Sequence, residues 1–192
     1  MENNGKLIIF SAPSGSGKTT IVHELLKRFP ALRFSVSATS RAMRPGEQDG
    51  KDYHFLSADE FKRYRDQGKF LEWEEVYPDQ FYGTLMSEVE RIWNEGGHVV
   101  FDVDVKGGLN IKRKFPERTL AVFVSPPSLE ELENRLRKRG TETEESLKKR
   151  VGKAGKEMES APLFDRIVVN DNLEKAIEET RLLVEKFLQK PI

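Results

Sequence analysis

The stretch SAPSGSGKTT, Ser11–Thr20, follows the apolar run Leu7–Phe10 and precedes residues with a helical pattern. Its end matches the pattern G-x-x-x-x-G-K-[ST], in which the backbone N–H groups of a glycine-rich loop surround a phosphate. Ala12 stands where that pattern begins with glycine. A small residue suffices there if the turn after the strand does not need a positive φ. The stretch therefore predicts a strand, a phosphate-binding loop and a helix in succession.

The residues of this loop suit a triphosphate. Gly15 and Gly17 allow the backbone to bend, and a helix that begins near Lys18 adds its positive end to the same place. Lys18 would neutralise the β and γ phosphates, and the Thr19 hydroxyl would ligate Mg²⁺. The alternative is a flexible Gly/Ser loop with a solvated lysine. It is disfavoured because the motif lies between a strand and a helix, as it must.

The composition narrows the classes of protein that remain. With 192 residues, of which 37% are hydrophobic and 33% charged, the chain is long enough for one core, and we expect a single domain over residues 1–192. Lys plus Arg and Asp plus Glu number 32 each, so no net charge attracts nucleic acid or an anionic membrane. The absence of cysteine excludes disulfides and thiolate metal sites. The N-terminal apolar stretch is too short for a signal or membrane segment, and we expect a cytoplasmic protein.

Five short apolar runs, rich in Val, Ile or Phe, indicate buried strands. They are Leu7–Phe10, Phe34–Val36, Val99–Val103, Leu120–Val124 and Ile167–Val169. Helical patterns separate most of them, which is typical of a mainly parallel sheet with helices on its faces. The predicted fold class is α/β, with a five-stranded mainly parallel sheet flanked by helices, of the P-loop NTPase type.

Helix ends carry their own signals. Three serines, each followed three residues later by glutamate, predict capping boxes at helix starts, and these are Ser57, Ser87 and Ser128. Three glycines stand where helices would end in a left-handed turn, and these are Gly68, Gly96 and Gly140.

Two segments depart from the alternation of strand and helix. KDYHF, FLEWEEVY and QFYGT alternate their side chains as short exposed strands do, with a helix between the first two. They indicate a small mixed α/β insertion over about residues 37–88. The segment Thr141–Pro162 is charged and weakly apolar, which indicates a mobile helical lid over about residues 138–162.

Charged residues outside the loop mark two further candidate sites. Arg41 and Arg44, followed by Tyr53, could hold a second phosphate bidentately, although a pair of exposed loop arginines is equally compatible with the spacing. Asp102 and Asp104 end a buried strand and, being two apart, would lie on the same side of it. At the end of its strand, Asp102 resembles a Walker B carboxylate, which helps to hold Mg²⁺ directly or through water.

Taken together, these motifs resemble the guanylate kinases, P-loop nucleoside monophosphate kinases that phosphorylate GMP from ATP. The motifs that carry the resemblance, besides the loop, are LEWEEVY, FYGT, FDVDVKGG, RLRKRGTETEESLKKR and VVNDN, from about Gly5 to about Leu188. The resemblance implies phosphorylation of GMP, and of dGMP, by direct in-line transfer with Mg²⁺. It implies that residues 37–88 bind GMP and that residues 138–162 close as a lid.

The family's site residues carry over by similarity. The GMP phosphate would be held by Arg41, Arg44, Tyr53 and Tyr82, and the guanine by Ser37, Glu72, Thr84 and Asp104. ATP would contact Ala12, Pro13, Ser14, Gly15, Ser16, Gly17, Lys18, Thr19, Thr20, Arg135 and, through its adenine, Asn170. The positive charge for the transfer would come from Lys18, Arg41, Arg139 and Arg150, and the metal contacts from Thr19 and Asp102.

Glu72 suits the recognition of guanine, because one carboxylate can accept hydrogen bonds from both the N1–H and the N2 amino group of the base. Adenine presents a bare N1 acceptor and no amine there, a mismatch that can give discrimination on the order of 10⁴. The acceptor oxygen of GMP is already anionic, so no general base is required. None of His23, His54 and His98 is therefore expected to be catalytic.

Three positions depart from the family pattern, and none removes a charge that the transfer needs. Ala12 replaces glycine, Thr84 stands where serine is common, and Lys106 stands where glutamine is usual.

Two other functions stay open. One is a guanylate-kinase-like interaction module, although such modules are expected to lose the phosphate loop and the lid arginines. The other is a P-loop kinase for a different small phosphorylated acceptor. The oligomeric state is left open.

Overall fold

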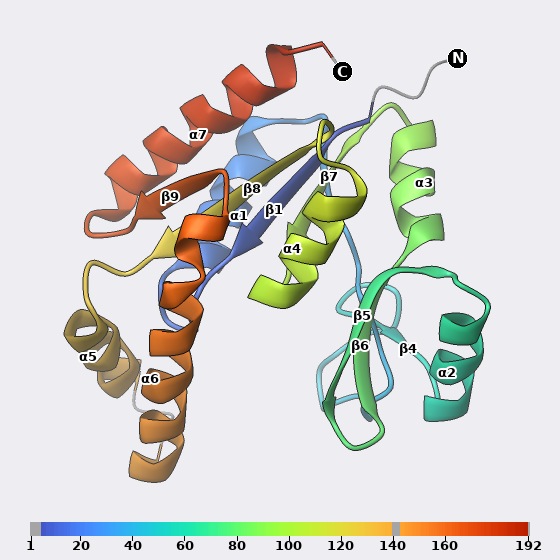
Figure 1. Ribbon diagram of the computed structural model, residues 1–192, viewed down its shortest axis with the longest axis horizontal. Coiled ribbons are helices and arrows are strands. Elements are labelled where there is room, and N and C mark those ends of the chain that lie inside the picture. The colour runs from blue at the N-terminus through green and yellow to red at the C-terminus, as the bar shows by residue number, and fades with distance from the viewer. Residues whose placement is uncertain (1–4, 140–142, 192) are drawn as a thin grey trace.

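The main sheet has five parallel strands in the order β2-β7-β1-β8-β9 (Figure 1). The computed structural model describes residues 5–139 and 143–191, with the side chain of Arg139 outside the description. The strands are β1 (Leu7–Ser11), β2 (Leu32–Phe34), β7 (His98–Asp102), β8 (Thr119–Ser125) and β9 (Arg166–Val169). The predicted fold class is confirmed.

Helices cover both faces of this sheet, as they do when crossover connections join parallel strands. On one face lie α1 (Lys18–Arg28) and α7 (Leu173–Gln189). On the other lie α3 (Met86–Asn94), α4 (Val105–Lys114) and the short 3₁₀ helix η1 (Ala161–Leu163). Every residue of β1 is buried between these two layers, so the loop that follows β1 begins from a fixed point.

A second, smaller sheet is built from the insertion, with the strand order β4-β3-β6-β5. Its strands are β3 (Ala38–Thr39), β4 (His54–Phe55), β5 (Phe70–Tyr77) and β6 (Gln80–Leu85), and α2 (Ala58–Asp66) packs against it. The sheet is mixed, because β3 runs parallel to β4 and antiparallel to β6. The predicted short strands and the helix between the first two are confirmed.

The insertion has a hydrophobic core of its own. The ring of Phe61 stacks on those of Phe70 and Phe81, with centroids 4.2 and 5.2 Å apart. All three side chains are buried, and their cluster shares no residue with the two clusters of the main sheet. The insertion therefore has a core of its own, while Leu71 of β5 packs into the cluster that lies between the main sheet and the helices α3 and α4.

Two helices form the region predicted to act as a lid, α5 (Leu129–Arg139) and α6 (Glu144–Glu159). They pack on each other through Leu132, Leu136 and Leu147. In Figure 1 this pair lies at the lower left and the insertion at the lower right. The lid is helical as predicted, and Thr141 lies outside the described residues. No helix in the described ranges is long and apolar enough to cross a membrane.

Most of the predicted helix ends are confirmed. Ser57 forms the complete capping box, and the Ser128 hydroxyl accepts from the backbone N–H three residues on at 3.0 Å. Gly68 and Gly96 have φ of 67° and 75° and follow α2 and α3. Gly140 lies outside the described residues.

Two predicted boundaries are wrong, and the insertion is the cause of both. Ser87 is no cap, because β6 runs directly into α3 with Leu85 at the N-cap position. The second strand is β2 and not Phe34–Val36, because the chain leaves the main sheet after Ser35 donates to the carbonyl of Val100 at 2.9 Å. The insertion is therefore joined to the main sheet by two short connections, one between β2 and β3 and one between β6 and α3.

Phe61→Ala is expected to lower the free energy of unfolding by about 3–5 kcal/mol, because it empties the centre of the insertion core. The matched control is Phe34→Ala, which truncates an aromatic side chain that is 40% exposed and should cost less than half as much. Urea unfolding followed by circular dichroism measures both variants. An equal loss in the two would contradict a separate, tightly packed insertion core.

Candidate active site

The loop between β1 and α1 has the backbone that anion binding requires. Gly15 and Gly17 have φ of 97° and 88°, in the region that favours glycine. Gly17 is the N-cap of α1 and provides no side-chain cap, so the first N–H groups of the helix are available to a ligand. Asp79 is the only non-glycine residue with positive φ in the described ranges, so Ala12 fits its turn without strain.

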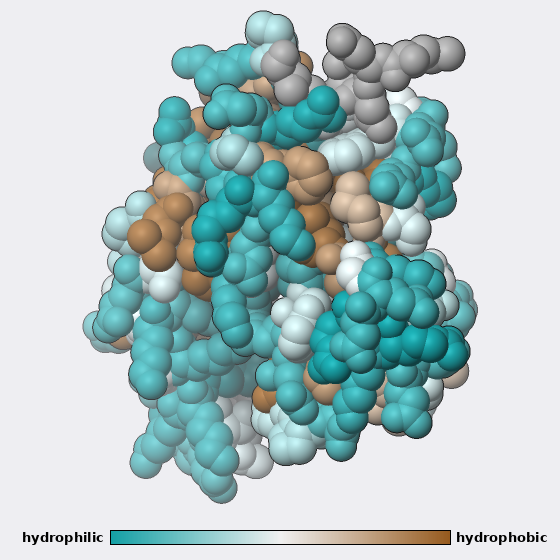
Figure 2. Space-filling view, turned by 45° about the vertical axis from the view of Figure 1, so that its right-hand side comes forward, coloured by the Kyte–Doolittle hydropathy of each residue, from teal (hydrophilic) through white to brown (hydrophobic). Residues whose placement is uncertain are grey.

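A cavity surrounds this loop, and its walls come from three parts of the fold. Loop residues Ala12–Thr20 form one side, the end of β7 forms another, and α6 provides Lys153 and Glu157. Figure 2 shows that hydrophilic residues cover the lid and insertion, in the lower part of the view, while hydrophobic residues gather above them. Every predicted phosphate-loop residue therefore faces one polar cavity.

Lys18 and Asp102 form an ion pair across this cavity, between the start of α1 and the end of β7. Burial lowers the pKa of Lys18 to about 8, and the carboxylates of Glu157 and Asp104 oppose that shift. The side chain therefore carries its positive charge at pH 7. It is placed to meet the phosphates of a nucleotide bound on the loop.

The donor set beside the loop fits Mg²⁺. The Thr19 hydroxyl and the Asp102 carboxylate both line the cavity, and hard oxygen ligands of this kind suit Mg²⁺. Within the described residues no group of three His, Cys, Asp or Glu side chains could hold a metal ion by itself. Mg²⁺ needs no such group when substrate phosphates and water complete its coordination.

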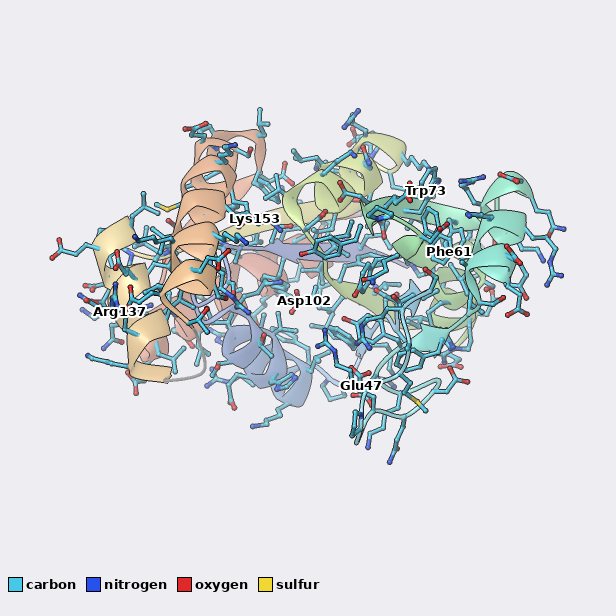
Figure 3. All side chains as sticks on the ribbon, turned by 90° about the horizontal axis from the view of Figure 1, so that it is seen from below. Glu47, Phe61, Trp73, Asp102, Arg137 and Lys153 are labelled. Atoms are coloured by element: carbon cyan, nitrogen blue, oxygen red, sulfur yellow. The ribbon has the colours of Figure 1, made fainter. Side chains whose placement is uncertain are left out.

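A second cavity lies between the insertion and the end of β7. Its lining includes five of the predicted GMP contacts, Ser37, Tyr53, Glu72, Tyr82 and Asp104. The two cavities share Asp102, Val103, Asp104 and Lys153. Figure 3 shows Asp102 at the centre, between Lys153 on the lid helix and Glu47 on the insertion. The predicted donor and acceptor sites therefore lie next to each other.

Arg41 is held in place by a residue that sequence reasoning missed. Its guanidinium donates to both carboxylate oxygens of Glu47, at 2.7 and 2.5 Å, and lies over the ring of Tyr53. Glu47 also accepts from the backbone N–H of Arg44 at 2.8 Å, and these contacts lower its pKa to about 2. The Arg44 side chain is exposed and does not line the cavity. A carboxylate so close to two arginines was the signal available in the sequence.

Glu72 and Thr84 form a buried pair on neighbouring strands of the insertion. The Thr84 hydroxyl donates to Glu72 Oε1 at 2.8 Å, and Glu72 is 9% exposed. Burial raises the pKa of Glu72 to about 7. A Cβ on Gly107 would lie 2.9 Å from Glu72 Oε2, so glycine there leaves room for the carboxylate.

The prediction that Asp102 and Asp104 share one side of a strand is wrong. β7 ends at Asp102, and Asp104 is the N-cap of α4, where its carboxylate accepts from the N–H of Gly107 at 2.7 Å. An acidic side chain just before a helix satisfies a free N–H there, which favours this arrangement. Lys106, the departure noted above, lies 3.2 Å from the carboxylate of Glu74.

The lid arginines differ in their surroundings. Arg150 donates to the Ser14 hydroxyl at 2.8 Å and so joins α6 to the phosphate loop. Arg135 donates to Glu131 one turn earlier on α5, at 2.9 Å. The Arg139 side chain lies outside the described part of the structure. Lys153 and Glu157 also face the loop cavity and were missed, because their spacing is equally suited to a solvated helix face.

Asn170, predicted to contact adenine, lies beside the phosphate loop. It follows β9 and is 5% exposed. Its side-chain amide donates to the carbonyl of Ser16 at 2.7 Å. The hydrogen bond that its side chain makes is therefore with the loop backbone.

A phosphate loop at the end of a parallel sheet, beside a second cavity on an insertion that is lined by tyrosines and carboxylates, is typical of a P-loop kinase of small phosphorylated acceptors. The family model for guanylate kinase matches residues 4–187. The chain belongs to the guanylate kinase family, as its motifs predicted.

Several relatives support this membership. The chain is 55% identical to a guanylate kinase of Salinibacter ruber over 182 residues, covering 95% of this chain and 96% of the relative. It is 53% identical to a guanylate kinase of Porphyromonas gingivalis, covering 96% and 99%. The crystal structure of guanylate kinase from Anaplasma phagocytophilum matches with a TM-score of 0.76 and 27% identity, over 99% of this chain and 89% of that one.

The raised pKa of Glu72 predicts a pH-dependent stability. Its folded value of about 7 lies above the ordinary 4.5, so the folded protein binds more protons between these values. The free energy of unfolding of the wild type should therefore fall as the pH rises from 5 to 8. Over this range it should fall by about 2 kcal/mol more than that of Glu72→Gln, which lacks the titrating carboxyl group. Chemical unfolding at each pH measures this difference.

The control for this experiment is Glu179→Gln, which removes an exposed glutamate on α7. It should follow the wild-type pH profile. A Glu72→Gln profile that also runs parallel to the wild type would contradict the raised pKa.

Proposed function

We propose that the protein transfers the γ-phosphoryl group of ATP to GMP, giving ADP and GDP. The observation that carries this proposal is the shared wall of the two cavities, which brings a triphosphate site next to a site with a buried carboxylate on the insertion. The contacts assigned to GMP go to its phosphate and its base. We therefore propose dGMP as a second substrate.

The reaction needs position and positive charge more than it needs a proton acceptor. A phosphate oxygen of GMP attacks the γ-phosphorus of ATP in line, the new O–P bond forms, and the bond to the β-phosphate oxygen breaks. The attacking oxygen is already anionic, so no side chain has to remove a proton. His98 fits this assignment, because its Nδ1 accepts from the backbone of Lys6 at the start of β7, away from the loop.

On the acceptor side, Arg41 is the proposed principal ligand of the GMP phosphate, with Tyr53 and Tyr82 beside it. The rings of Tyr53 and Tyr82 lie 5.9 Å apart, and Arg41 lies over the first of them. The arriving phosphate would share the guanidinium with Glu47 or take its place. Arg44, whose side chain is exposed, would complete the site by turning inward.

Glu72 is the proposed reader of guanine. In its ionised form the carboxylate accepts from two donors of the base, and the hydroxyl of Thr84 already fixes one of its oxygens. Guanine binding would favour the ionised form and so lower the pKa that burial has raised. Adenine would leave Glu72 facing a lone pair in a closed site, and this disfavours AMP.

On the donor side, Lys18 and the loop N–H groups would bind the phosphates of ATP. Arg150 already touches Ser14 and is the proposed lid cation, together with Arg139 and Arg135. Thr19 and Asp102 would hold Mg²⁺, which when bound offsets phosphate charge. Closing the lid would bring its arginines in after both substrates are bound and exclude water as a competing acceptor.

The function is tested by measuring ADP release with Mg-ATP and a panel of GMP, dGMP, AMP, UMP and CMP. GMP should exceed AMP, UMP and CMP by orders of magnitude in kcat/KM. In Glu72→Gln the ratio of GMP to AMP should fall at least about tenfold, because one acceptor oxygen becomes a donor. A different preferred acceptor would contradict the function, and an unchanged ratio would remove Glu72 from base reading.

Lys18→Ala should abolish turnover, by about a thousandfold or more in kcat, because the charge on the β and γ phosphates is left unbalanced. GMP affinity, measured by calorimetry, should stay within about threefold of wild type. Lys27→Ala is the matched control, since Lys27 lies on the same helix with an exposed side chain. Loss of GMP affinity equal to the loss of turnover would contradict two separate phosphate sites.

A further inference from the structure

Asn170 makes a buried contact with the phosphate loop that its predicted role does not explain. Its Nδ2 donates to the Ser16 carbonyl at 2.7 Å, across 154 positions of sequence. The two residues are 5% and 1% exposed. A buried amide bonded to a backbone carbonyl costs free energy if either partner is removed, so the contact holds both in place.

The backbone of Asn170 is fixed independently of this contact. Its N–H donates to the carbonyl of Ser125 at 2.8 Å, which continues the pairing of β9 with β8 beyond the last strand residue. β8 pairs in turn with β1, the strand that leads into the loop. The side chain therefore projects from the same rigid sheet that carries the loop.

Fixing the Ser16 carbonyl also fixes the N–H of Gly17. A trans peptide is planar, with its carbonyl and N–H pointing in opposite directions. Because the carbonyl points at Asn170, the N–H points away from it, and both loop residues line the phosphate cavity. Within the described residues this N–H has no hydrogen-bond acceptor. It is therefore available to a phosphate oxygen.

The shape of the loop at Gly17 fits this contact closely. Gly17 has a φ of 88°, and a Cβ built on it would lie 2.3 Å from Asn170 Nδ2. Only a residue without a side chain allows the amide to come this close. The glycine of the motif thus serves both the turn and the contact with Asn170.

We infer that Asn170 is a positioning residue for triphosphate binding: it orients the Ser16–Gly17 peptide so that the N–H of Gly17 faces the phosphates. It acts on the phosphates of the donor and not on its base. The inference rests on the phosphate role proposed above for the loop. It differs from an adenine contact in one measurable way, because it applies equally to a donor without adenine.

The test uses Asn170→Asp, which keeps the shape of the side chain but sets a carboxylate oxygen against the Ser16 carbonyl. KM is measured with ATP and with GTP as donors, and the Kd of Mg-tripolyphosphate is measured by calorimetry. All three constants should rise by at least about tenfold, the factor expected for one buried hydrogen bond replaced by repulsion. The Kd of GMP should stay within about twofold of wild type.

The matched control is Asn172→Ala. Asn172 lies two residues further on and caps α7, its side chain accepting from the N–H of Lys175 at 3.0 Å. This variant should lower the melting temperature and leave the three constants unchanged. If Asn170→Asp behaves as Asn172→Ala does, its role is only structural and the inference is wrong. If only the KM for ATP rises, while the KM for GTP and the Kd of Mg-tripolyphosphate do not, Asn170 contacts the base and the inference is also wrong.

Further variants separate the role of Asn170 from that of the loop and from a failure to fold. Lys18→Ala should lose tripolyphosphate binding, and if it does not, the phosphate role of the loop fails independently of Asn170. If Asn170→Asp does not fold, Asn170→Ser and Asn170→Ala take its place. The serine variant, which keeps a short donor, should weaken the three constants less than the alanine variant. The reverse order, or equal effects, would overturn the inference.

Discussion

The carboxyl ends of parallel strands meet at one edge of a sheet, and the whole site depends on that constraint. β1 delivers the phosphate loop to this edge, β7 delivers Asp102 and β9 delivers Asn170. The three strands are bonded through β1 and β8, so these groups share a common frame. Residues separated by more than a hundred positions thus meet without any long connecting loop.

The charges assigned to ligands have partners within the protein. Lys18 pairs with Asp102, Arg41 pairs with Glu47, and Glu72 holds a hydrogen bond from Thr84. Substrate binding is then an exchange of one set of partners for another, so its net free energy is smaller than the new contacts alone would give. Such exchange favours selectivity, because a ligand that satisfies these groups imperfectly loses the partner it displaces.

Local patterns predicted local features well. The glycines of the loop, the main sheet and the Ser57 cap all follow from short-range rules of backbone and capping chemistry. Asp104 shows the limit of these rules. Its position fits both a strand residue and a helix cap, and only the structure shows that it is the N-cap of α4. Glu47 and the loop contact of Asn170 were missed for another reason. The partners of Glu47 are three and six residues away, but its spacing also suits an exposed loop carboxylate, whereas the partner of Asn170 is 154 positions away and is defined by tertiary packing, which a single sequence does not reveal.

The direct passage of β6 into α3 has a mechanical consequence. A strand that continues into a helix without a loop has few free dihedral angles, and the other junction of the insertion is nearly as short. The insertion has its own aromatic core, and it also contacts the main domain through Leu71 of β5, which packs into the main-sheet cluster and accepts a hydrogen bond from Lys114 of α4. Its short junctions and this contact limit its motion to that of one body. The position of the acceptor relative to the donor is then governed by very few angles. A rotation of the insertion as one body would move Glu72 and Arg41, the proposed contacts of the base and of the phosphate, together.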